Sequence, residues 1–122
     1  GTWAALRPIE RAERIGALID HLESRKDELV DAMVAEAGQL RLYAEFAQFA
    51  MGVEMGRGTV DLYLSLDDEE MNPVPVDDLV KGRVALSVRR HEPVGVVSAI
   101  TPFNGALIMA VQKVIPALLT GN

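Results

Sequence analysis

Residues 94–119 read VGVVSAITPFNGALIMAVQKVIPALL, and the fold follows from this stretch. The first part, 94–100, is nearly all apolar and rich in β-branched residues, which is typical of a strand buried on both faces of a parallel sheet. Residues 101–104 predict a tight turn, and apolar residues then recur at helical spacing from 105 to 119. Strand, short turn and helix are half of a βαβ unit, so the stretch predicts the α/β fold class.

The beginning of the chain predicts two helices. Pro8 suits a first helical turn, where its missing N–H costs nothing. An apolar stripe follows at spacings of three and four, formed by Ile9, Ala12, Ile15, Ile19 and Leu22. Ser24 followed by Asp27 resembles a capping box and predicts that the second helix starts there. Gly38 is a natural residue to end that helix.

A third helix is expected to begin near Leu40. Its apolar residues fall on two faces, Leu40, Ala44, Ala47 and Met51 on one and Leu42, Phe46, Phe49 and Val53 on the other. A helix with two apolar faces packs between layers and not on a surface. Gly52, Gly56 and Gly58 follow, and each destabilises a helix by about 1 kcal/mol relative to Ala. We therefore expect the helix to fray or kink there and to resume over 62–66.

The sequence predicts one partial domain in three parts. Residues 1–66 form the helical segment, residues 67–80 an acidic loop, and residues 81–122 the strands and the helix that carries the turn. The loop has no hydrophobic periodicity and contains acidic residues and prolines. Apolar and polar or small residues alternate from 84 to 88, which predicts a half-exposed strand.

The composition excludes several classes of protein. The chain has 122 residues, of which 49% are hydrophobic and 25% charged, as in a globular protein and unlike a disordered one. Its net charge of −6 disfavours generic binding to nucleic acid. No segment is apolar over the roughly 18–20 residues that a membrane span needs, so we expect no membrane partner. The lack of cysteine fits a reducing compartment, and we expect a cytoplasmic location.

Asn104 is the polar residue best placed for chemistry. It follows a predicted strand and precedes a helix, and ligands of open α/β sheets bind at such positions. One interpretation is that its side chain caps the helix, a role that Asn fills well. The other is that its amide donates a hydrogen bond to a developing oxyanion. The two differ in where the side-chain nitrogen points.

Two other patterns do not predict sites. Gly56-Arg57-Gly58 has Asp61 where the third glycine of a dinucleotide fingerprint would fall, and it follows a helix. His21 and His91 have no partner histidine at ligand spacing, so we expect no metal site.

Three blocks of sequence resemble the aldehyde dehydrogenase superfamily. They are Glu92-Pro93-Val94-Gly95-Val96-Val97, Ile100-Thr101-Pro102-Phe103-Asn104, and Lys113 with Pro116-Ala117-Leu118-Leu119-Thr120-Gly121-Asn122. Their order and spacing match the family's E-P-x-G-V segment, I-x-P-(W/F)-N turn and K-x-x-P-A-L-x-x-G-N helix end. Trp3, Arg11 and Arg14 in the first helical region look similar as well. The resemblance is strong from Arg89 onward and loose before it.

The resemblance implies a fold and a site. The fold would be a partial Rossmann-like cofactor domain, mostly helical in these residues. Asn104 would donate its amide hydrogen to the oxygen of a thiohemiacetal, and Lys113 would be a partly buried lysine linked to a glutamate proton relay. On sequence grounds Lys113 is equally well a solvated lysine on a helix. The residues that would line the nicotinamide and pyrophosphate part of bound NAD or NADP are Ile100, Thr101, Pro102 and Phe103.

The resemblance also implies an activity, the oxidation of an aldehyde to a carboxylic acid with NAD(P)+. In the family a cysteine attacks the aldehyde, and that cysteine would lie outside residues 1–122. We therefore expect these residues to be the N-terminal portion of a longer enzyme and to be inactive alone. Many members have Phe-Pro after the asparagine. This chain has Gly105-Ala106, which implies a roomier or differently shaped substrate entrance.

Association of the chain with copies of itself is expected for two reasons. Segment 83–91 resembles the part of the family that helps build the subunit interface. The apolar faces of 94–100 also need cover, so we expect either oligomers or a rearranged final strand and helix. The alternative to an enzyme is a non-catalytic helical module that acts by association.

Overall fold

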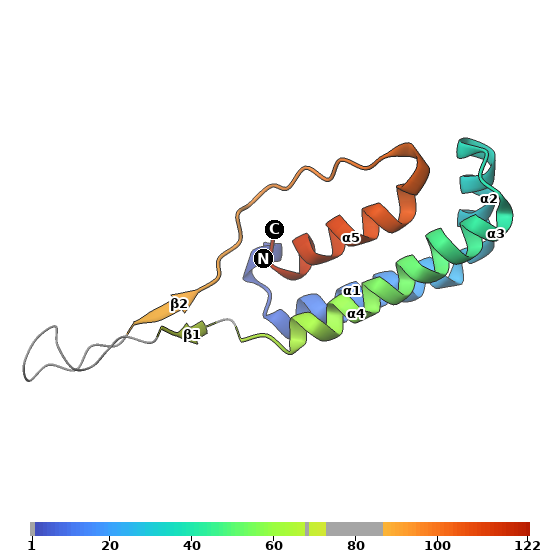
Figure 1. Ribbon diagram of the computed structural model, residues 1–122. Coiled ribbons are helices and arrows are strands. Elements are labelled where there is room, and N and C mark those ends of the chain that lie inside the picture. Colours follow the sequence, from blue (N-terminus) through green and yellow to red (C-terminus); the bar gives the residue numbers. More distant parts are fainter. Residues whose placement is uncertain (1, 68, 73–86) are drawn as a thin grey trace, which may run out of the picture.

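The computed structural model describes residues 2–67, 69–72 and 87–122, and Figure 1 shows a mostly helical chain with a small antiparallel ribbon. The helical elements in chain order are η1 (Trp3–Ala5), α1 (Pro8–Ser24), α2 (Lys26–Ala37), α3 (Arg41–Tyr43), η2 (Ala44–Ala50), α4 (Met51–Leu64), η3 (Phe103–Gly105) and α5 (Ala106–Leu119). The strands are β1 (Glu69–Met71) and β2 (Val88–Arg90).

Helices α1 and α2 lie where the sequence predicts them, with one difference at their junction. Pro8 begins α1, as predicted, and Gly38 ends α2 in the left-handed conformation with a φ of 61°. The predicted capping box is wrong, because α2 begins at Lys26 without a side-chain cap. Ser24 is the last residue of α1, and its hydroxyl donates to the carbonyl of His21. The Ser24 hydroxyl therefore bonds within α1 and does not cap α2.

The long helix that follows Gln39 runs through the glycines without a break, so the predicted fraying or kink is wrong. Helix α4 continues from Met51 to Leu64. A Cβ atom added to Gly52 would lie 3.6 Å from Cα of Ile108, and one added to Gly56 would lie 2.9 Å from Cδ1 of Ile115. The glycines therefore let α4 approach α5 closely. The irregular part comes earlier, in η2, which is π-helical.

Only one side of the helix formed by α3, η2 and α4 is buried among the described residues. It combines Ala44 of one predicted face with Phe49 and Val53 of the other, and all three lie in the core. Of the remaining predicted residues, Ala47 is half-buried, and the exposed ones are Leu40, Leu42, Phe46 and Met51. The prediction of a helix packed between two layers is therefore wrong for the described part of the chain.

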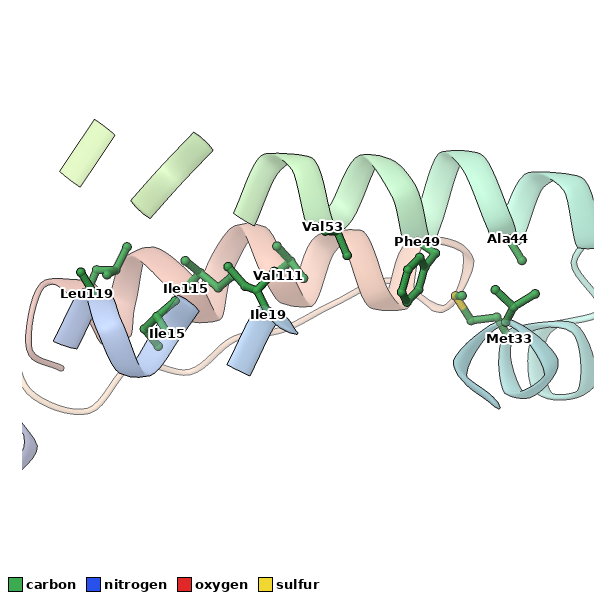
Figure 2. Close-up of a cluster of buried hydrophobic side chains, with 11 residues drawn as sticks. Ile15, Ile19, Met33, Ala44, Phe49, Val53, Val111, Ile115 and Leu119 are labelled. Atoms are coloured by element: carbon green, nitrogen blue, oxygen red, sulfur yellow. The ribbon is translucent and has the colours of Figure 1, made fainter. Parts of the chain in front are cut away.

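The core is formed where α1, α4 and α5 pack together (Figure 2). Ile15 and Ile19 of α1 are 2% and 1% exposed, and they share the cluster with apolar side chains of α5. Those α5 residues are Val111, Ile115 and Leu119. Met33 of α2 and Phe49 of η2 extend the cluster toward the start of α5 (Figure 2). The apolar stripe predicted in the first helix is confirmed at its centre, whereas Ile9 is 44% exposed.

The two strands form an antiparallel pair in which Glu70 faces Arg89. Their side chains form an ion pair. Strand β1 lies inside the segment predicted to be an acidic loop, and the rest of that loop from residue 73 lies outside the described residues. The predicted strand at 84–88 is described only at its end, where Val88 begins β2. The three-part division of the chain stays a prediction.

Segment 94–100 is not the buried strand that its composition predicts. Its residues are exposed, Val96 at 102% and Ile100 at 77%, and it pairs with no strand among the described residues. In Figure 1 it runs from β2 back along α5 to the start of that helix. The composition marks a segment suited to burial, but a sheet strand also needs neighbouring strands for its N–H and C=O groups.

Helix α5 has the predicted position and a regular end. The N–H groups of Gly121 and Asn122 donate to the carbonyls of Leu118 and Ala117, both at 3.0 Å, which is a Schellman motif. Gly121 has a φ of 87°, and a Cβ there would lie 3.0 Å from Cγ of Pro93. Both the conformation and the close approach of segment 93–95 therefore require glycine.

Within the described residues, no helix combines the length and the apolar character needed to cross a membrane.

Candidate functional site

The predicted turn lies at the start of α5 and is short, as expected. Pro102 is extended, with φ −76° and ψ 155°, and the 3-10 turn η3 follows it. The N–H of Gly105 donates to the carbonyl of Pro102 at 3.4 Å. Regular α-helix begins at Ala106. The turn therefore presents residues 100–104 beside the N-terminal end of α5.

Asn104 is exposed at its side chain and held at its backbone. Its carbonyl oxygen accepts hydrogen bonds from Nε2 of Gln48 at 2.9 Å and from Nε2 of Gln39 at 3.2 Å. The capping position of α5 is Gly105, and no side chain caps the helix there. The interpretation of Asn104 as the side-chain cap of this helix is therefore wrong. Its amide makes no hydrogen bond to another described residue.

Lys113 connects α5 to the beginning of the turn. Its side chain is half-buried, and Nζ donates to the carbonyl of Ile100 at 2.5 Å. The ammonium group is thus used to hold the turn and does not simply extend into solvent. An ammonium has three N–H donors, so two remain for other acceptors. A role in proton transfer stays a prediction.

The four predicted cofactor-lining residues are all exposed. Phe103 is 84% exposed and Ile100 77%. The full set is Ile100, Thr101, Pro102 and Phe103. Fixed backbone and free side chains make this turn a surface to which another molecule or chain segment can bind.

The opposite end of α5 holds the other end of the extended segment. Oδ1 of Asn122 accepts from the backbone N–H of Gly95 at 2.8 Å. Nδ2 of Asn122 donates to the carbonyl of Ala117 at 3.2 Å and to the hydroxyl of Thr120 at 2.9 Å. The E-P-V-G block and the G-N block therefore meet in space. Both blocks can be recognised in the sequence, but their contact cannot be predicted from it.

Two N-terminal side chains satisfy the last carbonyls of α5. Nε1 of Trp3 donates to Leu118 at 2.7 Å, and Nε of Arg11 donates to Leu119 at 2.7 Å. Arg11 is 8% exposed and also donates to the carbonyl of Leu6 and the hydroxyl of Tyr63. Because helix ends leave carbonyls without partners, these contacts fix the helix that carries the turn.

The pKa shifts in the described residues occur in exposed ion pairs at the starts of α1 and α2 and in the pairs that Arg41 and Arg57 form with acidic residues of α2 and α1. The hydrogen bond from the Arg7 side chain lowers the pKa of the Glu10 carboxyl, and Arg25 lowers that of Glu28 in the same way. These pairs lie outside residues 100–104, so they bear on stability and not on the turn.

Pockets and metal-binding clusters do not add to this site. A pocket of about 510 Å³ lies at the C-terminal end of α5 and is lined by Arg11, Tyr63 and Asn122 among others. A second, of about 620 Å³, lies beside Arg57. Neither is lined by residues 100–104. Within the described residues, no three His, Cys, Asp or Glu side chains gather as a metal site would require.

Comparison with known proteins gives consistent matches along the whole chain. A sequence model described as "Aldehyde dehydrogenase family" matches residues 1–122. A 2-aminomuconic 6-semialdehyde dehydrogenase of Pseudomonas sp is 29% identical over 100% of this chain and 24% of the relative. A phenylacetaldehyde dehydrogenase of Pseudomonas fluorescens is 32% identical over 98% of this chain and 24% of the relative.

A solved structure gives the same result for the fold. The NADP-dependent glyceraldehyde-3-phosphate dehydrogenase of Bacillus halodurans C-125, complexed with NADP, matches with a TM-score of 0.84 and 31% identity over 98% of this chain and 25% of that chain. This match confirms the expected fold, a partial and mostly helical cofactor domain. The chain spans about a quarter of the length of the relatives it matches.

Proposed function

Because the chain belongs to the aldehyde dehydrogenase family, we propose that it is part of a longer enzyme that oxidises an aldehyde to a carboxylic acid with NAD(P)+. The 122 residues contain no cysteine, so the nucleophile would come from elsewhere in that enzyme. The chain alone would then be inactive. A cytoplasmic location belongs to the same proposal, and cell fractionation tests it.

The observation that carries the proposal is the way in which the turn is held. Its backbone is tied at Ile100 by Lys113 and at Asn104 by two glutamine amides, while the side chains between them are exposed. A turn that is fixed in place before anything binds to it can orient a reacting group without further loss of entropy.

The groups around the turn fit part of a dinucleotide. Ile100 and Phe103 offer exposed apolar surface of the kind that contacts a planar ring. The first turn of α5 has no side-chain cap, so its backbone N–H groups can donate to a phosphate. In this proposal residues 100–103 hold the nicotinamide end of NAD(P)+, which when bound accepts a hydride.

Asn104 and Lys113 would act on the substrate side. Attack of a thiolate on the aldehyde carbon turns the carbonyl oxygen into an oxyanion. The exposed amide of Asn104 would donate a hydrogen bond to that oxygen. This hydrogen bond is stronger in the transition state than in the ground state, because the oxygen gains negative charge. Lys113 would use its remaining N–H groups to hold a glutamate that passes a proton to or from water.

Gly105 supports an altered substrate entrance. It is buried, and a Cβ at this position would lie 3.1 Å from Cγ of Met109. A Phe side chain in its place would require Met109 to move. We expect the entrance beside Asn104 to be shaped by Met109 in this chain.

The test uses the full-length gene product with an aldehyde and either NAD+ or NADP+. Changing Asn104→Ala should lower kcat by roughly 10²–10³, because one oxyanion donor is lost. Gln112→Ala is the matched control, since it removes an exposed amide from α5 without touching the turn. A turnover that is unchanged in Asn104→Ala would overturn the role of this residue. Absence of aldehyde-dependent NAD(P)H formation in the wild-type protein would overturn the proposed reaction.

Association without catalysis is the second candidate, and the exposed apolar face of α3 and η2 favours it. Leu42 is 67% exposed and Phe46 65%. Exposed apolar surface of this kind is often covered by another copy or another chain. Light scattering of the 122-residue chain with and without NAD+ tests this candidate. Oligomers that form without NAD+ would support association, and a stable monomer under both conditions would contradict it.

A further inference from the structure

A buried glutamine contacts the backbone of Asn104, and the proposed reaction gives it no role. Gln48 is 1% exposed and lies in the π-helical segment η2, among apolar side chains. Its Nε2 donates to the carbonyl oxygen of Asn104 at 2.9 Å. A buried amide on an otherwise apolar helix face is unusual, because burying polar groups is costly unless they are hydrogen-bonded.

A second glutamine reaches the same oxygen from another direction. Gln39 lies between α2 and α3, and its Nε2 donates to the carbonyl of Asn104 at 3.2 Å. A carbonyl oxygen has two lone pairs, so the two glutamines occupy both acceptor positions of the Asn104 backbone oxygen. The backbone of Asn104 is therefore held by two elements that are far from it in sequence.

Both glutamines retain a buried side-chain oxygen without a partner in the described part of the chain. An apolar residue of similar size would avoid that cost, so stability alone does not account for glutamine at position 48. What glutamine supplies and an apolar residue cannot is the N–H that reaches Asn104.

Gln48 lies in the π-helical segment η2. A π-helical turn contains more residues than an α-helical one, and such segments are frequent at functional sites. Ala44, Gln48 and Gly52 are buried at every fourth position, while Phe49 stays in the core beside them. Because Gly52 has no side chain, the helix comes close to Ile108 in the first turn of α5.

We propose that Gln48, assisted by Gln39, is a positioning residue that fixes the Asn104 peptide and so directs the Asn104 amide toward the oxyanion. This inference rests on the proposed function of Asn104. Fixing the peptide orients the Cα–Cβ bond of Asn104, which narrows the directions available to an otherwise exposed amide. An oxyanion donor is effective when its direction is set before the reaction.

The first experiment measures kcat and both KM values in the full-length enzyme. Gln48→Leu keeps the volume and removes the donor, and we expect kcat to fall about tenfold or more with little change in KM, because small misplacements of a reacting group slow the chemical step. Gln39→Leu should have a smaller effect, since its bond is longer and its side chain is less buried. Gln112→Leu on the surface of α5 is the matched control. A Gln48→Leu enzyme with wild-type kcat would overturn the proposal.

A double-mutant cycle separates positioning from a general structural effect. If Gln48 acts through Asn104, Gln48→Leu should lower kcat no further in the Asn104→Ala enzyme. An equal loss in both backgrounds would overturn the proposal. If Asn104→Ala itself leaves kcat unchanged, the proposed role of Asn104 fails. The nuclear magnetic resonance measurement below then decides whether Gln48 and Gln39 restrain the Asn104 peptide, a pair of contacts that we call the clamp.

A pH profile supplies a readout that loss of packing would not give. In Gln48→Glu the new carboxylate faces the Asn104 carbonyl, and burial raises its pKa. Below that pKa the protonated group can donate again, so kcat relative to wild type should recover as pH falls. A ratio that does not change with pH would count against the proposal.

Nuclear magnetic resonance tests the clamp without activity. In the 122-residue chain, the side-chain amide of Asn104 should become more mobile in Gln48→Leu and in Gln39→Leu, whereas that of Asn72 should not change. Unchanged mobility of Asn104 in folded variants would contradict the clamp. If Gln48→Leu does not fold, Gln39→Leu and Gln48→Glu provide the same comparison.

Discussion

The packed helices bury their apolar residues, whereas the extended segment that runs along α5 exposes them. In the helices, Ile19 is 1% exposed and lies between α1, α4 and α5. In the extended segment 94–100, Val96 is 102% exposed and is held in place only through its neighbours. The segment is attached at two points, Gly95 to Asn122 and Ile100 to Lys113. One region is held by packing and the other by hydrogen bonds.

The difference shows that the structure of the helices follows from the local sequence pattern, whereas the structure of the segment depends on whether other strands pair with it. A helix satisfies its own backbone and needs only one apolar stripe to pack. A strand needs other strands, which sit at no fixed distance in sequence. The composition of 94–100 therefore indicates that the segment is suited to burial in a sheet. In this chain its position is set by the hydrogen bonds to Asn122 and Lys113.

The largest expected difference between the two regions comes from truncating one buried and one exposed branched side chain. Ile19→Ala should lower the free energy of unfolding by about 2–5 kcal/mol, because it leaves a cavity in the core. Val96→Ala should change it by less than about 0.5 kcal/mol, because nothing packs on this side chain. Thermal and urea unfolding of the 122-residue chain measure both. A large loss in Val96→Ala would mean that the segment is buried in solution.

The next effect concerns the contact between the two ends of the chain. Arg11→Met should cost about 1–3 kcal/mol, since the carbonyl of Leu119 and the hydroxyl of Tyr63 lose a donor. Arg11→Lys should not restore the loss, because an ammonium lacks the planar fork of donors. The exposed Arg14→Met is the control. Equal stability of the two Met variants would show that the end of α5 is held by packing alone.

Two glycines of α4 test whether this helix packs closely against α5. Gly58 has nothing within 4 Å of an added Cβ, so Gly58→Ala should stabilise the chain by about 0.5–1 kcal/mol through helix propensity. At Gly56 the added methyl group meets Cδ1 of Ile115 at 2.9 Å. Overpacking there should offset the gain in propensity, so Gly56→Ala should be less stable than Gly58→Ala. The reverse order, measured by urea unfolding, would contradict close packing at Gly56.

The smallest effect is the pH dependence of the exposed ion pairs. The hydrogen bond from Arg7 holds the pKa of Glu10 below its unfolded value. Its stabilising contribution is therefore present above the unfolded pKa and is lost as pH falls through the folded pKa. Glu10→Gln should lower Tm slightly at pH 7 and not at all in strong acid, with exposed Glu36→Gln as the control. A difference that grows toward low pH would have the wrong sign.

Much of the helical structure could be predicted from the sequence, because spacing and capping act within a few residues. The stripe around Ile15, the end of α2 at Gly38 and the end of α5 at Gly121 are examples. The unbroken course of α4 through its glycines could not be predicted, because helix propensity carries no information about Ile108 and Ile115 of α5, which occupy the space beside Gly52 and Gly56. The exposure of 94–100 could not be predicted, because it depends on whether other strands lie beside the segment, and among the described residues none does.

The candidate site could be predicted only in part. The turn at 100–104 follows from its sequence motif. Lys113 lies in the helix that follows this turn, and its Nζ donates to the carbonyl of Ile100. The two glutamines that hold Asn104 are 56 and 65 residues away in sequence. The sequence carries one signal for Gln48, which is a polar residue four positions after Ala44 on a predicted apolar face. Which group such a residue contacts depends on the packing of η2 against α5.

The most direct test is a crystal structure of the full-length enzyme trapped with its aldehyde adduct. We expect Nδ2 of Asn104 to lie about 2.7–3.1 Å from the adduct oxygen. We also expect the Asn104 carbonyl to accept a hydrogen bond from Gln48 in that structure. An Asn104 amide turned away from the adduct, or bonded to the backbone of α5 as a cap, would contradict it.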